Sequence, residues 1–224
     1  QKALQLNPNH TDAHNNMGMA LYDQGRFDEA VESYRAAVKL EPDYADAHYN
    51  LGNALKQTGE LKQAIESYKA SLAINPNDAE VLLNYGNSLK NYGDFNQAIE
   101  MYGKALKISP NYTAAQTKMD NAIEEKTKID ENVSVYARVA KLEINSAEVI
   151  SFNGICLERK GYVDAAIESH KKALIIDPTC ASAFFNIGNA HLQKGELEES
   201  IYSYKNCLKF EPDFIAAFEN LEQL

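Results

Sequence analysis

The chain has 224 residues, with 22 Lys and Arg against 32 Asp and Glu, so its formal net charge is −10. An acidic surface disfavours a general nucleic-acid or anionic-membrane interface, because phosphate groups are repelled. No apolar run has the length that crosses a bilayer, and the three cysteines are too widely spaced for a CxxC-type metal site. We therefore expect protein or peptide partners, no cofactor, no metal, no membrane insertion and a cytoplasmic location, with nuclear or ciliary locations as alternatives.

All the prolines of the chain recur at a spacing of 34 residues or a multiple of it. Ile144 occupies the one position in this series that lacks a proline, and its surroundings still align with those of the other positions. The prolines are Pro8, Pro42, Pro76, Pro110, Pro178 and Pro212.

The first full repeat, 11–44, shows what each repeated position does. Apolar residues at helical spacing before and after Gly25 predict two helices joined by a turn. Gly18 removes a side chain where the two helices approach each other, and Pro42 ends the second helix. In chain order we expect half-unit 1–10, helix pairs at 11–44, 45–78, 79–112, 113–146, 147–180 and 181–214, and half-unit 215–224.

The repeated glycine, glycine, alanine, tyrosine, alanine and proline have the spacing of the tetratricopeptide repeat, so the whole chain resembles that family. Gly18, Gly25, Ala30, Tyr34 and Ala37 carry the pattern in the first unit. The resemblance implies an all-α fold, a single α-solenoid over 1–224 that winds into a right-handed superhelix. It also implies a protein–protein interaction module in which neighbouring helix pairs bury each other's apolar faces.

Unit 113–146 departs from the pattern. Asp120 replaces the close-approach glycine, Thr127 the turn glycine and Asn132 a small alanine, whereas the apolar positions are kept. We expect a helix pair whose packing is loosened. Neutral drift in one repeat explains it, and so does a joint or docking surface in the solenoid.

The sequence contains none of the phosphate-binding, nucleophile-elbow or zinc-protease motifs. We therefore do not expect this segment to be an enzyme.

Asparagines recur two residues before the close-approach glycine and again one residue after it. Asparagine is a middling helix former, and its amide matches the carbonyl and N–H groups of an extended peptide. One interpretation is a peptide-binding inner face, and the other is that the amides bond between the helices of the repeat. The array is similar to the superhelix of O-linked N-acetylglucosamine transferase, which implies a peptide-holding role for the first row, interrupted at Lys118 and Phe152. The first row is Asn16, Asn50, Asn84, Asn186 and Asn220, and the second is Asn53, Asn87, Asn121 and Asn189.

Apolar residues replace polar ones on this face in the later repeats, namely Phe152, Ile155, Phe185 and Leu192. They predict an apolar pocket for a side chain of the partner. Asn153 lies on a normally apolar position, so a small rotation of the helix that buries Phe152 in the core is the alternative.

The co-chaperones that clamp the carboxylate end of Hsp70 or Hsp90 need a lysine three residues before the glycine. This chain has other residues there, so we do not expect it to belong to that class. Three functions remain: a peptide-binding adaptor, a rigid scaffold subunit of a large assembly such as a ciliary transport or cell-cycle complex, and the substrate-recruiting arm of a transferase-like enzyme. The residues at the clamp position are Asn15, Tyr49, Leu83, Ser151 and Phe185.

Overall fold

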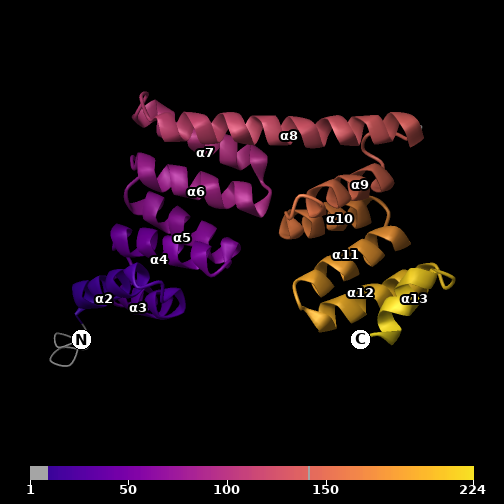
Figure 1. The fold of residues 1–224 in the computed structure, drawn as a ribbon, viewed down its shortest axis with the longest axis horizontal. Coiled ribbons are helices and arrows are strands. Elements are labelled where there is room, and N and C mark those ends of the chain that lie inside the picture. Colours follow the sequence, from indigo (N-terminus) through magenta and orange to yellow (C-terminus); the bar gives the residue numbers. More distant parts are fainter. Residues whose placement is uncertain (1–9, 141) are drawn as a thin grey trace. The chain divides into compact units, whose positions relative to one another are not determined.

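A computed structural model describes residues 10–140 and 142–224. Within these residues the chain forms twelve α-helices and no strands, as the all-α prediction requires (Figure 1). The predicted half-unit 1–10 lies outside the described residues except for His10. The helices are α2 (Thr11–Asp23), α3 (Phe27–Leu40), α4 (Ala45–Gln57), α5 (Leu61–Ile74), α6 (Ala79–Tyr92), α7 (Phe95–Ile108), α8 (Thr113–Ala140), α9 (Ala147–Glu158), α10 (Val163–Ile176), α11 (Ala181–Gln193), α12 (Leu197–Phe210) and α13 (Ile215–Glu222).

Consecutive helices pack as pairs: α2 with α3, α4 with α5, α6 with α7, α9 with α10, and α11 with α12. The second helix of a pair also contacts the first helix that follows it where α3 meets α4, α5 meets α6, α10 meets α11 and α12 meets α13. This nearest-neighbour stacking is the arrangement of an α-solenoid. Contacts divide the chain into two compact units, which we call unit 1 (1–123) and unit 2 (124–224).

Each pair is held by a close contact between a glycine and an aromatic ring. A Cβ atom added to Gly86 would lie 2.5 Å from Cε1 of Tyr102, whose side chain is completely buried. Only glycine leaves room for the ring there. The same contact joins Gly18 to Tyr34, Gly52 to Tyr68, Gly154 to His170 and Gly188 to Tyr204.

The turn between paired helices uses the left-handed backbone conformation. Gly93, between α6 and α7, has a φ of 94°, which L-residues with a Cβ adopt at a cost of about 1–2 kcal/mol. The equivalent glycines of the other pairs also have positive φ angles. The 34-residue spacing thus locates two kinds of glycine, one that packs against an aromatic ring and one that forms the turn.

The prediction of a helix pair at 113–146 is wrong, because this segment contains one continuous helix of 28 residues, α8. Figure 1 shows it running straight past the point at which the other repeats reverse. Asp120 stands where Gly86 stands one repeat earlier, and a side chain there would collide with the ring of a paired second helix. Thr127 stands where Gly93 stands, and a β-branched residue strongly disfavours a positive φ.

Charge pairs on α8 span the position of the missing turn. Lys126 bonds Asp130 at 2.5 Å, and Lys128 bonds Glu124 at 2.6 Å. Pairs four residues apart stabilise a helix by about 0.2–0.5 kcal/mol each, so they favour continuation over reversal. These charge pairs thus support the straight helix.

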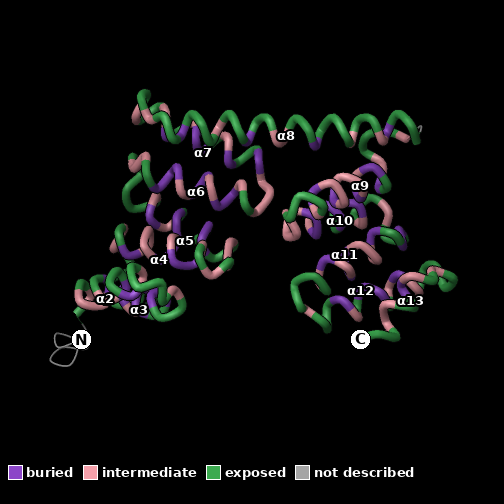
Figure 2. The backbone as a smooth tube through the Cα atoms, viewed as in Figure 1, coloured by how far each residue is buried: buried purple, intermediate pink, exposed green. Residues whose placement is uncertain are grey.

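The buried side of α8 is narrow. Ala115, Ala122 and Ile129 are buried and follow one another at intervals of seven residues, and Ala137 is buried further along. Residues at this spacing share one face of a helix. Figure 2 shows the remainder of α8 as largely exposed.

Candidate peptide-binding face

The first helices of successive repeats lie closer together than the second helices. Helix α4 contacts both α2 and α6, and α9 contacts α11, whereas no comparable contact joins α3 to α5 or α5 to α7 in the part of the chain that the structure describes. Each stack therefore curves with its first helices on the inner side. We call this side the first-helix face, defined in unit 1 by α2, α4 and α6 and in unit 2 by α9 and α11.

The second asparagine row holds the helix pairs together. The buried hydroxyl of Tyr102 donates to Oδ1 of Asn87 at 3.0 Å. Tyr68 and Tyr204 donate in the same way, at 2.7 Å each, to Oδ1 of Asn53 and of Asn189. Burial raises the pKa of Tyr68 and of Tyr102 far above the ordinary value for a phenol, so both hydroxyls stay protonated and act as donors.

Asn121, the remaining member of the second row, is exposed on α8. It has no paired helix to bond, because the hairpin is not formed there. The carbonyl oxygens of Asn53, Asn87 and Asn189 are thus occupied within the repeat, and a role of this row in peptide binding stays a prediction.

The first row links neighbouring repeats. Nδ2 of Asn50 donates to Oδ1 of Asn15 at 3.1 Å, and Nδ2 of Asn84 donates to the hydroxyl of Tyr49 at 2.9 Å. In unit 2, Nδ2 of Asn186 donates to Oγ of Ser151 at 3.5 Å. In each case the acceptor lies 35 residues earlier, so the bond joins two consecutive first helices. The alternative role of the amides, bonding between helices, is therefore real.

The asparagines of the first row differ in how many amide groups these hydrogen bonds leave without a partner. Asn84 is fully engaged, because its Nδ2 also lies 3.3 Å from the carbonyl oxygen of Glu80 and its Oδ1 accepts from Lys56 at 3.4 Å. Asn220 donates both to Asn189 and to Tyr204, at 3.1 Å each.

Asn16 and Asn50 keep the most capacity in unit 1. Asn16 is exposed, and among the described contacts its side chain makes no hydrogen bond. Asn50 is half-buried and uses one N–H, so its carbonyl oxygen and second N–H remain available, as they do at Asn186 in unit 2.

The sequence alone does not reveal the hydrogen-bond acceptors of the first asparagine row or its cationic neighbour, Lys56. Tyr49 donates to Glu80 at 2.7 Å while accepting from Asn84, and burial raises its pKa to about 12. Burial, and next the charge of Lys118, lower the pKa of Lys56. Asn15 and Tyr49, which directly precede Asn16 and Asn50, were the available signal. Their partners, however, are defined only once the two helices are in register.

The four apolar residues predicted to form a pocket belong to different contacts. Phe152 stacks on Tyr136 with ring centroids 3.9 Å apart, whereas Phe185 packs against Tyr204 and Phe214. Ile155 is half-buried and Leu192 is exposed, with 36% of its surface accessible. A shared pocket of Phe152, Ile155, Phe185 and Leu192 stays a prediction.

The described residues hold no group of three or more His, Cys, Asp or Glu side chains that could bind a metal ion. None of the described helices combines the length and apolar character that a bilayer crossing needs.

Family models of the TPR repeat and the tetratricopeptide repeat match residues 1–32, 18–59, 45–78, 79–112 and 181–214. The chain belongs to the tetratricopeptide repeat family. Tetratricopeptide repeats are generally non-catalytic, and this tetratricopeptide repeat chain is a protein–protein interaction module. The matches leave out 113–180, the segment that contains α8 and the repeat after it.

Solved tetratricopeptide structures share the fold. The TPR domain of p58(IPK) superposes with a TM-score of 0.56 at 21% identity, over 95% of this chain and 64% of that one. The first TPR of Spaghetti (RPAP3), solved bound to an HSP90 peptide, gives 0.51 at 17% identity, over 52% and 93%. YrrB, described as a TPR protein with an unusual peptide-binding site, gives 0.49 at 19% identity, over 100% and 97%. A comparison with curated protein sequences gives no match.

Proposed function

We propose that this chain is an adaptor whose first-helix face in unit 1 holds an extended peptide segment of a partner protein. The observation that carries the proposal is the pair Asn16 and Asn50, which stand one repeat apart and keep unused carbonyl and N–H groups on one face. An extended peptide offers backbone carbonyl and N–H groups along its length, so such amides bind it largely independently of its side chains.

The strength of the hydrogen bonds limits the affinity. Each contributes about 1 kcal/mol, and ordering a peptide costs about 2–5 kcal/mol, so two amides alone give weak binding. Lys56 and the hydroxyl of Tyr49 lie beside Asn84 and extend the polar surface. The net charge of −10 steers neutral or basic segments to the face in preference to acidic ones.

A rigid scaffold subunit is the second candidate function. It is favoured by two exposed apolar side chains near the end of α8, because Val135 is 49% and Val139 75% accessible. A partner packed along α8 would cover them. A transferase-like recruiting arm would use the same ladder as the adaptor and is tested by the same experiment.

The experiment compares immobilised wild type with Asn16→Ala/Asn50→Ala and with Asn96→Ala. Asn96 is exposed on α7, outside the first-helix face, and serves as the matched control. Peptides from a digested proteome are captured and quantified by mass spectrometry. Circular dichroism checks that all three proteins are equally helical.

Peptides that the double variant loses are then resynthesised with alternate backbone nitrogens methylated. We expect the control to retain the peptides, the double variant to lose most of them, and methylation to weaken binding at least tenfold. Equal capture by all three proteins, or indifference to methylation, contradicts the proposal and leaves the scaffold as the better function.

A further inference from the structure

A hollow of about 450 Å³ lies in unit 2 between the second helices α10 and α12, on the side of the stack away from the first-helix face. Phe184 and Ile187 of α11 line it together with Leu174 of α10 and Tyr202 of α12. Glu198 and Glu199, in the first turn of α12, complete its rim. Apolar side chains thus form its base and carboxylates its edge.

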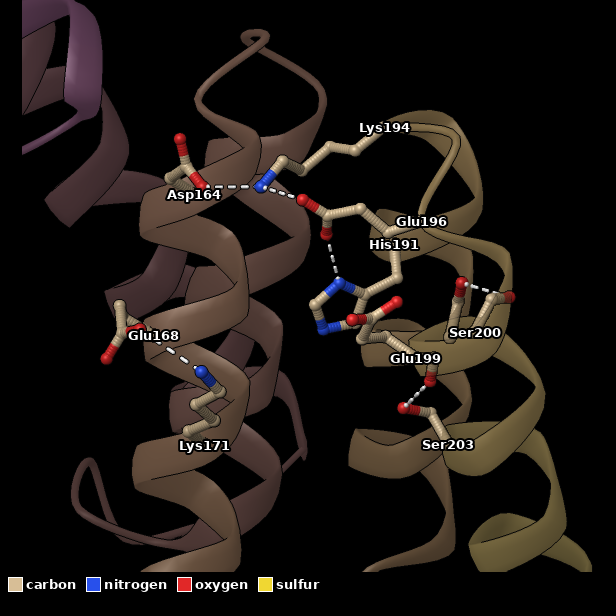
Figure 3. A network of polar contacts seen from close by, with 10 residues as sticks. Asp164, Glu168, Lys171, His191, Lys194, Glu196, Glu199, Ser200 and Ser203 are labelled. Atoms are coloured by element: carbon tan, nitrogen blue, oxygen red, sulfur yellow. Dashed lines mark hydrogen bonds and ion pairs between the residues drawn. The ribbon is translucent and has the colours of Figure 1, made fainter. Parts of the chain in front are cut away.

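Of the two matching positions in unit 1, the one between α3 and α5 is crossed by a side chain, whereas Lys69 at the other bonds Glu66 on its own helix at 2.7 Å. Arg35 of α3 donates to Oε1 of Gln63 on α5 at 2.8 Å and lies 3.7 Å from Glu60. Four repeats later, Lys171 takes the position of Arg35 and Glu199 that of Gln63. Lys171 instead bonds Glu168 on its own helix at 3.3 Å, so the hollow is left uncrossed (Figure 3).

The surface beside the hollow is more apolar than the surface beside the position between α3 and α5. Tyr202 is 70% accessible and stands at the repeat position of Glu66, and Ile175 is 80% accessible and stands at that of Lys39. Exposed apolar groups around a concave site are typical of a surface that a partner covers.

One end of the hollow is closed by a charge network. Lys194 bonds Asp164 of α10 at 3.0 Å and Glu196 at 2.8 Å, and Glu196 also bonds Nδ1 of His191 at 2.5 Å. Figure 3 shows these contacts bridging α10 to the turn before α12. They fix the spacing of the two helices, and a preformed site loses less entropy when it is occupied.

The carboxylates of the rim differ from those of the network. Among the described residues, Glu198 and Glu199 form no ion pair with a cationic side chain of the chain. His191 lines the same hollow as Glu199. Two unpaired negative charges at the edge of an apolar site attract a partner group of opposite charge.

We propose that this hollow is a second docking site, which receives an apolar side chain of a partner segment that carries lysine or arginine next to it. The apolar side chain fills the space that Arg35 crosses in unit 1, and the neighbouring basic group pairs with Glu198 or Glu199. The site is independent of the first-helix face, so the chain joins two partner segments rather than one.

The test uses three fluorescein-labelled heptapeptides with a central phenylalanine flanked by two lysines, two serines or two glutamates. Fluorescence anisotropy at low ionic strength gives their affinities, and two-dimensional NMR of the labelled protein identifies the amides that shift. We expect the lysine-flanked peptide to bind at least fivefold more tightly than the serine-flanked one, with the largest shifts in α10 and α12.

Two variants separate the parts of the site. Lys171→Arg/Glu199→Gln restores the crossing pair of unit 1 and should weaken the lysine-flanked peptide at least tenfold. Glu198→Gln/Glu199→Gln keeps the shape and should remove only the preference for lysine. Asn16→Ala/Asn50→Ala, which alters only the first-helix face, should leave the amide shifts in α10 and α12 unchanged.

Three results overturn the proposal. They are shifts confined to the first-helix face, loss of the shifts in α10 and α12 in the asparagine variant, and unchanged affinities in both variants of the hollow. The first two point to the first-helix face as the binding site, so failure here is distinguishable from failure of the proposed function.

Discussion

Segments 79–112 and 113–146 follow each other in the chain, have the same length and keep the same apolar spacing, yet only the first reverses. The first forms the pair α6 and α7, and the second forms the single helix α8. Their decisive differences are at two positions, Gly86 against Asp120 and Gly93 against Thr127. Apolar periodicity thus specifies that a segment is helical, whereas the two glycines specify that it turns back and packs on itself.

The largest expected effect comes from placing the side chain of Asp120 into the regular repeat. Gly86→Asp forces a carboxylate against the buried ring of Tyr102 and should lower the free energy of unfolding of unit 1 by about 4 kcal/mol. Urea denaturation measures the loss. Gly103→Asp is the control, because a Cβ at Gly103 meets nothing within 4 Å. Equal losses in the two variants would show that the close contact is unimportant.

The repeat after α8 differs from the others at the aromatic position, where His170 replaces tyrosine. Its ring is buried, Nδ1 lies 3.0 Å from Oγ of Ser151, and burial lowers its pKa from 6.5 to about 4. The unfolded chain therefore binds a proton at a pH where the folded chain does not. Stability is full above pH 6.5, falls as the pH drops below it, and has decreased by roughly 3 kcal/mol near pH 4.

Urea denaturation of unit 2 between pH 7 and pH 4 checks this dependence. His170→Tyr restores the residue of the other repeats and should remove this part of the pH dependence, whereas the remaining carboxylates titrate as before. A parallel pH profile in the wild type and the variant contradicts the assignment.

The turn glycine is the next test of the comparison. Gly93→Thr should lower the free energy of unfolding by about 2 kcal/mol, because in the left-handed conformation of that position the β-branched side chain clashes with the backbone. Gly93→Asn should cost clearly less, since asparagine tolerates this conformation. Thermal unfolding ranks the three proteins, and a threonine variant as stable as the asparagine variant argues against a strained turn.

The second asparagine row offers a matched pair of smaller changes. Asn87→Ala leaves the buried hydroxyl of Tyr102 without its acceptor and should cost about 1–2 kcal/mol. Asn121→Ala changes the same repeat position on α8, where the side chain is exposed, and should be neutral or slightly stabilising. Chemical denaturation that gives equal losses would contradict the proposed pairing.

The smallest change is at the position of the missing turn. Thr127→Gly should destabilise α8 by about 0.5–1 kcal/mol, because glycine is a poor helix former. Spin labels at Thr117 and Arg138 should remain about 31 Å apart along the helix axis, at a rise of about 1.5 Å per residue. A short distance in a pulsed electron resonance measurement would instead indicate a hairpin.

Much of this fold can be predicted from the sequence, because each regular repeat has the same residues at its helix ends, turn and close contact. The proline and glycine positions predicted where helices start, turn and end. Segment 113–146 is the exception, because Asp120 and Thr127 do not merely loosen the packing of a helix pair but exclude the hairpin itself.

The candidate site was less predictable than the fold. The position of the ladder on the first helices follows from spacing, but the hydrogen-bond partners depend on the register between neighbouring helices. Helix packing across repeats determines that Asn50 bonds Asn15 and that Asn84 bonds Tyr49. The open hollow beside Lys171 likewise depends on a rotamer that pairs this side chain within its own helix.

The contact between a glycine and a buried tyrosine also gives the molecule a set of built-in optical probes. The chain has no tryptophan, so its 13 tyrosines dominate its near-ultraviolet absorption and emission. Tyr34, Tyr68 and Tyr102 report on successive helix pairs of unit 1, whereas Tyr204 reports on unit 2. Difference spectra of single tyrosine-to-phenylalanine variants therefore resolve, without any attached dye, the order in which the helix pairs come apart.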